Sequence, residues 1–173
     1  MKDFLAKFFL LLVLSVIAFF IGELVGMEQA KADDTSSQDQ VIELANKNGL
    51  KPSNRIVDAI LQASSRYNID PLELTAIGIL ESGLGKYARN RVNKNGTVDK
   101  GVFQINTVNY KACIEYNLTS IEGNAFCAAK ILSTIKSEHS KDYLGRYHSK
   151  TNYRKLAYIN KVNNILARSE LHD

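Results

Sequence analysis

The chain has 173 residues, 45% of them hydrophobic, and a formal net charge of +4. This length and composition supply an adequate core for one domain. Lys and Arg are scattered among Asp and Glu and do not form runs, which argues against nucleic acid as a partner. The mild basic excess suits another anionic polymer, such as a cell wall, or an anionic membrane surface.

The N-terminus has the pattern of an export signal. Two lysines precede an apolar run over residues 8–21, and Ala30-Lys31-Ala32 forms a small-x-small cleavage site. We therefore predict a signal peptide over residues 1–32. The alternative is an uncleaved membrane anchor over residues 8–25, whose length of about 18 is the lower limit for a span. Either way, the rest of the chain is expected outside the cytoplasmic membrane, in the periplasm or cell envelope.

The chain has two cysteines, Cys113 and Cys127, and both follow the predicted signal. In an oxidising compartment we expect them to form a disulfide between neighbouring helical segments. The alternative is a pair of buried free thiols. The three histidines, His139, His148 and His172, show no metal-ligand spacing with them, so no metal site is predicted.

Apolar spacing and turn residues predict a mostly helical chain after a polar linker over residues 33–40. The predicted helices cover residues 41–48, 54–66, 71–82, 107–116, 119–135 and 153–166. A hairpin that turns at Asn95-Gly96 is expected over residues 91–99, and a loop around Gly145. The fold class predicted is α+β, predominantly α-helical.

Capping residues mark where several of these helices begin. Ser53 is a plausible cap for the helix over 54–66. Asp70 caps the next helix, Pro71 takes its first position, and Glu73 stands three residues after the cap in a capping-box arrangement. Thr119, with Glu122 three residues on, marks a later start.

Glu81 is the most informative acidic residue. It shares one face of its helix with Leu74, Ile77 and Gly78, so it lies among apolar side chains. It also stands at the helix C-terminus, where the backbone dipole disfavours negative charge. Both effects favour the protonated acid, which is the form that a general acid needs. The alternative is a buried, hydrogen-bonded structural glutamate.

Four ordered motifs resemble those of lytic transglycosylases of the soluble, goose-lysozyme-like type. They are AIGILESG at 76–83, GVFQIN at 101–106, YHS at 147–149 and YINKV at 158–162. The resemblance spans roughly residues 54–166 and is strongest to the small exported members that accompany secretion and conjugation systems.

The resemblance implies a lysozyme-like fold with one small hairpin. It divides the chain into the signal or anchor, a linker with a short helix over 33–52, a catalytic domain over 53–168 and a tail over 169–173. The expected partners are peptidoglycan glycan strands and a secretion, conjugation or pilus apparatus. The protein is expected to be a monomer that needs no cofactor or metal.

The resemblance also assigns roles to individual residues. Glu81 matches the single catalytic acid and base. The predicted substrate-binding residues are Ser82, Phe103, Gln104, Asn106, Tyr147 and Tyr158. Phe103 replaces the more common methionine and would pack on a sugar, and His148 stands where asparagine is usual. For Phe103 and Tyr158, simple core packing is the alternative.

The implied reaction cleaves the bond between N-acetylmuramic acid and N-acetylglucosamine and leaves a 1,6-anhydro ring. Two alternatives remain open. A hydrolytic muramidase usually has a second carboxylate to activate water, and Asp99 is the acid suitably placed by sequence. A wall-binding protein without turnover would keep the sugar groove but not the chemistry.

Overall fold

A computed structural model describes residues 19, 21–23 and 35–170. The chain divides into two compact units, residues 1–36 and 37–173. The predicted signal or anchor falls almost entirely outside the described residues, as does its cleavage site; of that segment, residues 19 and 21–23 are described and are helical. In the described parts of the chain, no helix is both long enough and apolar enough to cross a membrane.

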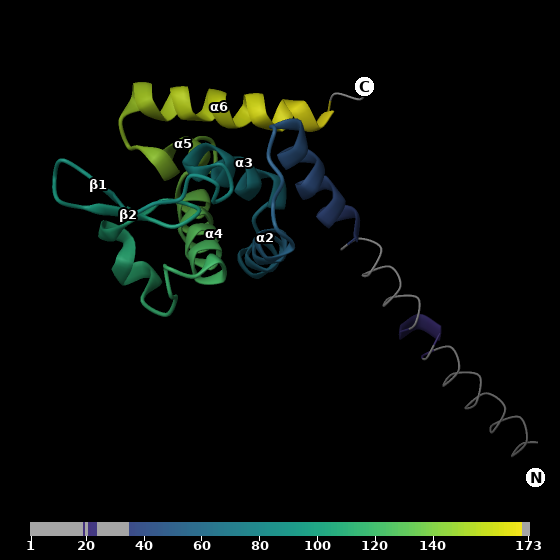
Figure 1. Ribbon diagram of the computed structural model, residues 1–173. Helices are drawn as coiled ribbons and strands as arrows, with labels where there is room; N and C mark the ends of the chain where they lie inside the picture. Colours follow the sequence, from purple (N-terminus) through teal and green to yellow (C-terminus); the bar gives the residue numbers. More distant parts are fainter. Residues whose placement is uncertain (1–18, 20, 24–34, 171–173) are drawn as a thin grey trace, which may run out of the picture. The chain divides into compact units, whose positions relative to one another are not determined.

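The second unit is mostly helical with one small antiparallel sheet (Figure 1). Its helices are residues 37–47 of a helix that begins at residue 35, α2 (Asn54–Tyr67), α3 (Pro71–Ser82), α4 (Ile121–Glu138), α5 (Tyr143–His148) and α6 (Asn152–Glu170), with a 3-10 helix η1 (Thr107–Cys113). Its strands are β1 (Arg91–Val92), β2 (Val98–Lys100) and β3 (Ile105–Asn106), in the order β1-β2-β3. The predicted α+β class, predominantly helical, is confirmed.

The sheet extends the predicted hairpin by one strand. Arg91 pairs with Asp99 across the turn at Asn95-Gly96, as expected from the sequence. Asp99 in turn pairs with Asn106 of β3, which the sequence did not predict as a strand. A two-residue strand is too short to show an alternating pattern, so it leaves no periodic signal.

Three helical predictions were wrong in extent or kind. The first helix begins at residue 35, within the stretch read as a linker, and buries Val41, Leu44 and Ala45. The segment around Gly145 is α5 and not a loop. The helix predicted over 107–116 is the shorter 3-10 helix η1, which ends at Cys113.

The start of α3 is partly as predicted. The Asp70 carboxylate accepts a hydrogen bond from the Leu72 N–H at 2.8 Å, and Pro71 follows. The capping-box role of Glu73 was wrong. Its carboxylate accepts a hydrogen bond from the Tyr143 hydroxyl, a long-range contact that the local sequence does not reveal.

The start of α4 lies one residue later than predicted. Ser120, not Thr119, is the N-cap, and its hydroxyl accepts a hydrogen bond from the Gly123 N–H at 3.0 Å. At the start of α2, Ser53 takes the N-cap position, but its side chain makes no capping hydrogen bond.

The core forms where α2 packs on α4 and where α6 lies along α5 and α3 (Figure 1). α3 is buried along the face that carries Leu74, Ile77 and Gly78. Cys113 and Cys127 form the predicted disulfide, which ties η1 to α4 and excludes a pair of free thiols. These contacts hold the C-terminal end of α3 beside the sheet, α5 and α6.

Close packing and a cluster of ion pairs stabilise the interface between α5 and α6. A Cβ on Gly145 would lie 2.4 Å from Cγ of Lys155, so glycine allows the two helices to touch. The Asp142 carboxylate accepts hydrogen bonds from Arg146 Nε, at 2.7 Å, and from the mostly buried Lys155. These two bonds lower the pKa of Asp142 to about 2.

Because Asp142 titrates, this cluster makes part of the free energy of unfolding depend on pH. Because the folded-state pKa of Asp142 lies below the ordinary aspartate value of ~3.9, its contribution is fully present above that value and is lost as the pH falls toward about 2. We expect Asp142→Asn to lower the free energy of unfolding at neutral pH and to reduce the further loss between about pH 4 and 2. Urea unfolding across this pH range measures both effects.

Asp58→Asn is the matched control, because Asp58 is exposed on α2. Its acid-dependent loss of stability should equal that of the unaltered chain. An equally steep acid loss in Asp142→Asn would contradict the assignment.

Candidate active site

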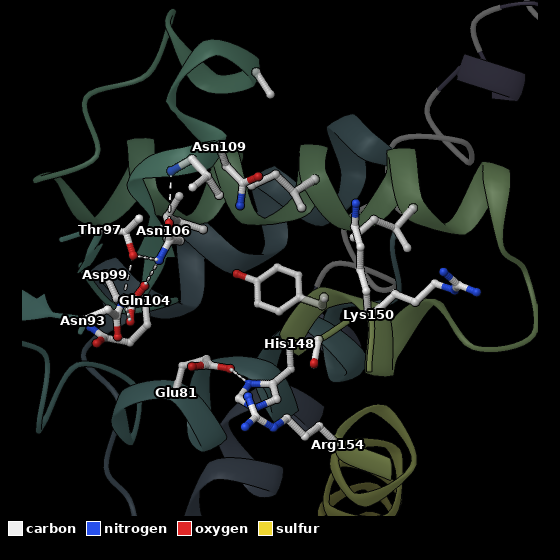
Figure 2. A pocket seen from close by; sticks show the side chains of 18 of the residues that line it. Glu81, Asn93, Thr97, Asp99, Gln104, Asn106, Asn109, His148, Lys150 and Arg154 are labelled. Atoms are coloured by element: carbon white, nitrogen blue, oxygen red, sulfur yellow. Dashed lines mark hydrogen bonds and ion pairs between the residues drawn. The ribbon is translucent and has the colours of Figure 1, made fainter. Parts of the chain in front are cut away.

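A cavity of about 910 Å³ runs past the end of α3, and we call it the groove. Figure 2 shows Glu81 and His148 on one side, facing polar side chains from the sheet and from the segments that connect its strands. The residues that line it include Glu81, Arg91, Asn93, Thr97, Asp99, Gln104, Asn106, Tyr147, His148 and Arg154. Four of the seven predicted site residues therefore line one cavity: Glu81, Gln104, Asn106 and Tyr147.

The end of α3 places Glu81 at the groove. Gly83 adopts a left-handed conformation, with φ of 60°, and its N–H closes the last turn by bonding to carbonyls of that turn. A Cβ on Gly78 would lie 2.8 Å from Leu84 and 3.1 Å from Phe103, so this glycine lets the following loop pack on the helix. The Glu81 side chain is left 17% exposed, at the edge of the core.

Two side chains from other helices meet one carboxylate oxygen of Glu81. The Tyr158 hydroxyl donates a hydrogen bond to Oε1 at 2.8 Å. His148 Nδ1 lies 3.8 Å from the same oxygen. The imidazole stacks on the Tyr158 ring, with centroids 4.6 Å apart and planes 8° from parallel. Glu81 is therefore sheltered and oriented within a cavity.

The two tyrosines near Glu81 remain protonated donors. Burial, with a further contribution from the nearby Glu81 charge, raises the pKa of Tyr158 far above its usual value. The same two causes, in the same order, raise the pKa of Tyr147 well above its usual value. The Tyr147 hydroxyl donates a hydrogen bond to the Phe103 carbonyl at 3.0 Å. This bond fixes α5 against the second of the four motifs, GVFQIN at 101–106.

Gln104 lies in the groove with a strained backbone. Its φ of 46° is in the left-handed region, which a residue with a Cβ rarely adopts. Its side-chain nitrogen donates to the carbonyls of Gly101, at 2.7 Å, and Arg89, at 3.1 Å. Both amide protons are thus used within the protein, and the amide oxygen is the group left to accept from a ligand.

Two of the predicted substrate contacts, Phe103 and Ser82, are buried in the structure. Phe103 is 1% exposed, so it has no free face for a sugar ring; the core-packing alternative holds. Ser82 is 3% exposed, and its hydroxyl donates to the Val102 carbonyl at 2.6 Å and accepts from the Gly85 N–H at 2.9 Å. Ser82 thus joins α3 to the GVFQIN motif at 101–106.

Asn106 and Asp99 belong to one hydrogen-bonded network in the sheet. The Asn106 amide donates to Thr97 at 2.9 Å and to one Asp99 oxygen at 2.6 Å. The Asn93 amide donates to the other Asp99 oxygen at 3.0 Å. The Asn106 oxygen accepts from the Val108 N–H at 3.0 Å and caps η1. The side chains of Asn106 and Asp99 both line the groove, but these hydrogen bonds give each of them a structural role.

Asn124 positions the GVFQIN motif at 101–106, although it lies outside the four sequence motifs. It is fully buried on α4; its side-chain oxygen accepts from the Phe103 N–H at 2.8 Å, and its nitrogen donates to the carbonyls of Lys100 and Leu118. A Cβ on Gly101 would lie 2.4 Å from this nitrogen. The sequence could have indicated this role, because Asn124 lies on an apolar helix face and a buried side-chain amide requires hydrogen-bond partners.

A comparison with protein families decides the identity of this domain. The model of the transglycosylase SLT domain matches residues 58–158, more than half of the chain. The chain belongs to the transglycosylase SLT domain family. No curated protein matches the sequence.

SLT-domain membership has three consequences for this chain. The domain is lysozyme-like, in agreement with the helical architecture and small sheet. The activity is of the peptidoglycan transglycosylase type, with peptidoglycan as the substrate. Proteins with an SLT domain act on the cell wall, which implies an exported protein.

One face of α4 also lines the groove, and the four motifs did not predict this. Ile131, Thr134, Ile135 and Glu138 of α4 all line it. Their spacing of three, four and seven residues places them on one face of the helix, so the sequence contained a signal for a shared surface. It did not show that this surface borders a cavity.

Asn124 provides a test of how the SLT groove is built. Asn124→Ala leaves three backbone groups without their buried partner, at roughly 1–3 kcal/mol each. We expect the free energy of unfolding in urea to fall by about 3–5 kcal/mol. Asn109→Ala, in half-buried η1, should change it by less than ~0.5 kcal/mol. Equal effects of the two substitutions would contradict the positioning role.

Proposed function

We propose that this protein is a lytic transglycosylase that cleaves the MurNAc-β-1,4-GlcNAc bond and forms 1,6-anhydro-MurNAc. One observation carries the proposal: Glu81 lies sheltered in the groove, with the Tyr158 hydroxyl bonded to one of its oxygens. Glu81 is the proposed catalytic residue. Gln104 and Tyr147 are proposed to contact the sugars, because both line the groove.

In the first step, protonated Glu81 donates its proton to the glycosidic oxygen. The bond from that oxygen to the muramoyl C1 breaks, and N-acetylglucosamine leaves with a free hydroxyl. Glu81 becomes a carboxylate as its proton leaves. The Tyr158 hydroxyl is already in place to donate to that carboxylate, and a hydrogen bond to a charged acceptor is stronger than one to a neutral acid.

In the second step, the substrate completes the reaction. Its own 2-acetamido group stabilises the positive charge that develops at C1. The Glu81 carboxylate then takes the proton of the muramoyl 6-hydroxyl, and that oxygen forms the new bond to C1. The 1,6-anhydro ring closes, Glu81 regains its proton, and no water is consumed. One carboxylate therefore serves as acid and then as base.

A hydrolytic muramidase is the second candidate, because two further carboxylates line the groove. Asp99 is less suited to activate water, since each of its oxygens accepts a hydrogen bond from an asparagine side chain, one from Asn93 and one from Asn106. Glu138, at the C-terminal end of α4, is the other carboxylate in question. Inverting hydrolysis requires a base that holds a water opposite the acid. The engagement of Asp99 supports the non-hydrolytic outcome.

The cellular role proposed is local opening of the peptidoglycan for a secretion, conjugation or pilus apparatus. It is supported by the resemblance of the four motifs to small exported enzymes of such systems. The protein would act as an exported monomer in the periplasm or cell envelope, with its N-terminal segment as a signal peptide or an anchor.

Product analysis separates the two reactions. We expect mass spectrometry of digested peptidoglycan to show 1,6-anhydro-MurNAc ends. Reducing-end sugars without anhydro product would establish hydrolysis. In that case Asp99→Asn and Glu138→Gln identify the water-activating acid, provided that thermal unfolding shows that each variant is folded.

Glu81→Gln tests the proposed acid directly. The amide keeps the size of the side chain but is too weak an acid to protonate the glycosidic oxygen, so cleavage should fall by roughly 10²–10⁴-fold. Sedimentation with insoluble peptidoglycan should show that binding is retained. Unchanged cleavage would exclude Glu81 as the acid. Binding without cleavage by the unaltered chain would favour the wall-binding alternative.

Tyr158→Phe tests the orienting hydroxyl while preserving the ring. Loss of a hydrogen bond to a charged acceptor, worth roughly 1.5–3 kcal/mol, should lower kcat about tenfold to hundredfold. The raised pKa of Tyr158 keeps its hydroxyl protonated, so the loss should be the same from acidic to mildly alkaline pH. Tyr110→Phe, outside the groove, should leave kcat unchanged. A loss confined to high pH would contradict a permanent donor.

A further inference from the structure

A second cavity, of about 460 Å³, opens beside Glu81. The residues that define it here are Glu81, Arg91, His148, Tyr153, Arg154 and Lys161. Four of them, Glu81, Arg91, His148 and Arg154, also line the groove. The second cavity is therefore a branch that leaves the groove at the proposed acid, and we call it the side cavity.

One face of α6 forms much of the side cavity. Arg154, Ala157, Tyr158 and Lys161 all line it, at a spacing of three, four and seven residues. Ala157 has the smallest side chain of the four, so it leaves space between the two cations. Tyr158 is buried beside it and bonds to Glu81. The side cavity is thus continuous with the site of the proposed chemistry.

The side cavity has an excess of positive charge. Arg91 of β1 joins Arg154 and Lys161 of α6, and Glu81 is its one carboxylate among the described residues. Over residues 35–170, none of these three cations forms a salt bridge with a carboxylate. Three cations from two separate elements therefore face a shared space without acidic partners.

Arg154 is held in a defined orientation. Its Nε donates to the Tyr153 hydroxyl at 2.9 Å, and its guanidinium lies 5.6 Å from the centre of the Tyr153 ring. Its two terminal nitrogens remain available as a planar pair of donors. This arrangement suits a carboxylate, which accepts two parallel hydrogen bonds. The uncharged hydroxyl and acetamido groups of a glycan backbone do not require such a site.

The proposed reaction supplies a carboxylate at this place, so the inference rests on the proposed function. The muramoyl sugar attacked at C1 lies against Glu81, and its lactyl group carries a peptide branch with free carboxylates. We propose that the side cavity binds the carboxylates of this peptide branch, while the glycan chain follows the groove. Peptide-bearing glycan strands are then the preferred substrate class, and Arg154 and Lys161 are specificity-determining residues.

The test compares two substrates in one set of variants. Arg154→Gln/Lys161→Gln is assayed on peptide-bearing strands and on strands whose peptides an amidase has removed. We expect kcat/KM to fall at least about tenfold on the first substrate and several-fold less on the second, where only the contact of Arg154 with the groove is lost. Ala157→Leu, which fills the side cavity without changing charge, should give the same selective loss.

Lys51→Gln/Lys111→Gln is the matched control. It removes the same charge from exposed positions that line neither cavity, and its activity on both substrates should be unchanged. An equal loss in the control would assign the effect to general electrostatic attraction. An equal loss on both substrates, or no loss on either, would overturn the proposal.

A binding measurement keeps this inference separate from the proposed reaction. An isolated stem tetrapeptide is titrated into the Glu81→Gln chain and followed by NMR, beside the same peptide with its carboxylates converted to amides. We expect the acidic peptide to bind and the amidated form to bind at least about tenfold more weakly. Equal binding of the two peptides, or no binding of either, would overturn the side-cavity proposal even if Glu81-dependent cleavage is established.

Discussion

The hydrogen bond between Tyr158 and Glu81 joins residues 77 positions apart and depends on most of the fold. Glu81 reaches it because Gly83 ends α3 in a left-handed turn. Tyr158 reaches it because α6 packs on α5 at Gly145 and on α3. The same packing brings His148 onto the Tyr158 ring. A single short contact thus requires three helices to be correctly placed.

The second motif shows how structural and ligand-facing roles are divided within a few residues. Phe103 is buried, and its backbone N–H and carbonyl are held by Asn124 and Tyr147. Gln104 follows it with a left-handed backbone and lies in the groove. Ser82 is bonded to the same loop from the α3 side. The neighbours of Gln104 therefore maintain a conformation that would otherwise be unfavourable.

Local patterns predicted the parts of the fold that local energetics determine. The cap at Asp70, the apolar face of α3 and the turn at Gly83 were sufficient to place Glu81 at a helix end beside the core. The motifs also identified four side chains that line one groove. The hairpin was found because Asn95-Gly96 has a strong turn preference.

Two of the errors came from contacts between distant segments. Glu73 was read as a capping residue, but Tyr143 lies in contact with it in the folded chain. The six residues of α5 carry a glycine and have little helical signal of their own. Asp142, the N-cap residue of α5, forms an ion pair with Lys155 of α6, and this ion pair stabilises the helix. The motifs named Ser82 and Phe103 without separating residues that shape the site from residues that face it. Sequence pattern alone does not contain that distinction.

The crosslink between Cys113 and Cys127 relates groove architecture to cellular location. It anchors η1, whose Val108, Asn109 and Ala112 form part of the groove wall. Thiols stay reduced in a typical cytosol, so a newly made chain there lacks this covalent anchor. The part of the groove wall formed by η1 gains the disulfide only in an oxidising environment. Completion of this part of the groove wall is thereby coupled to export of the chain.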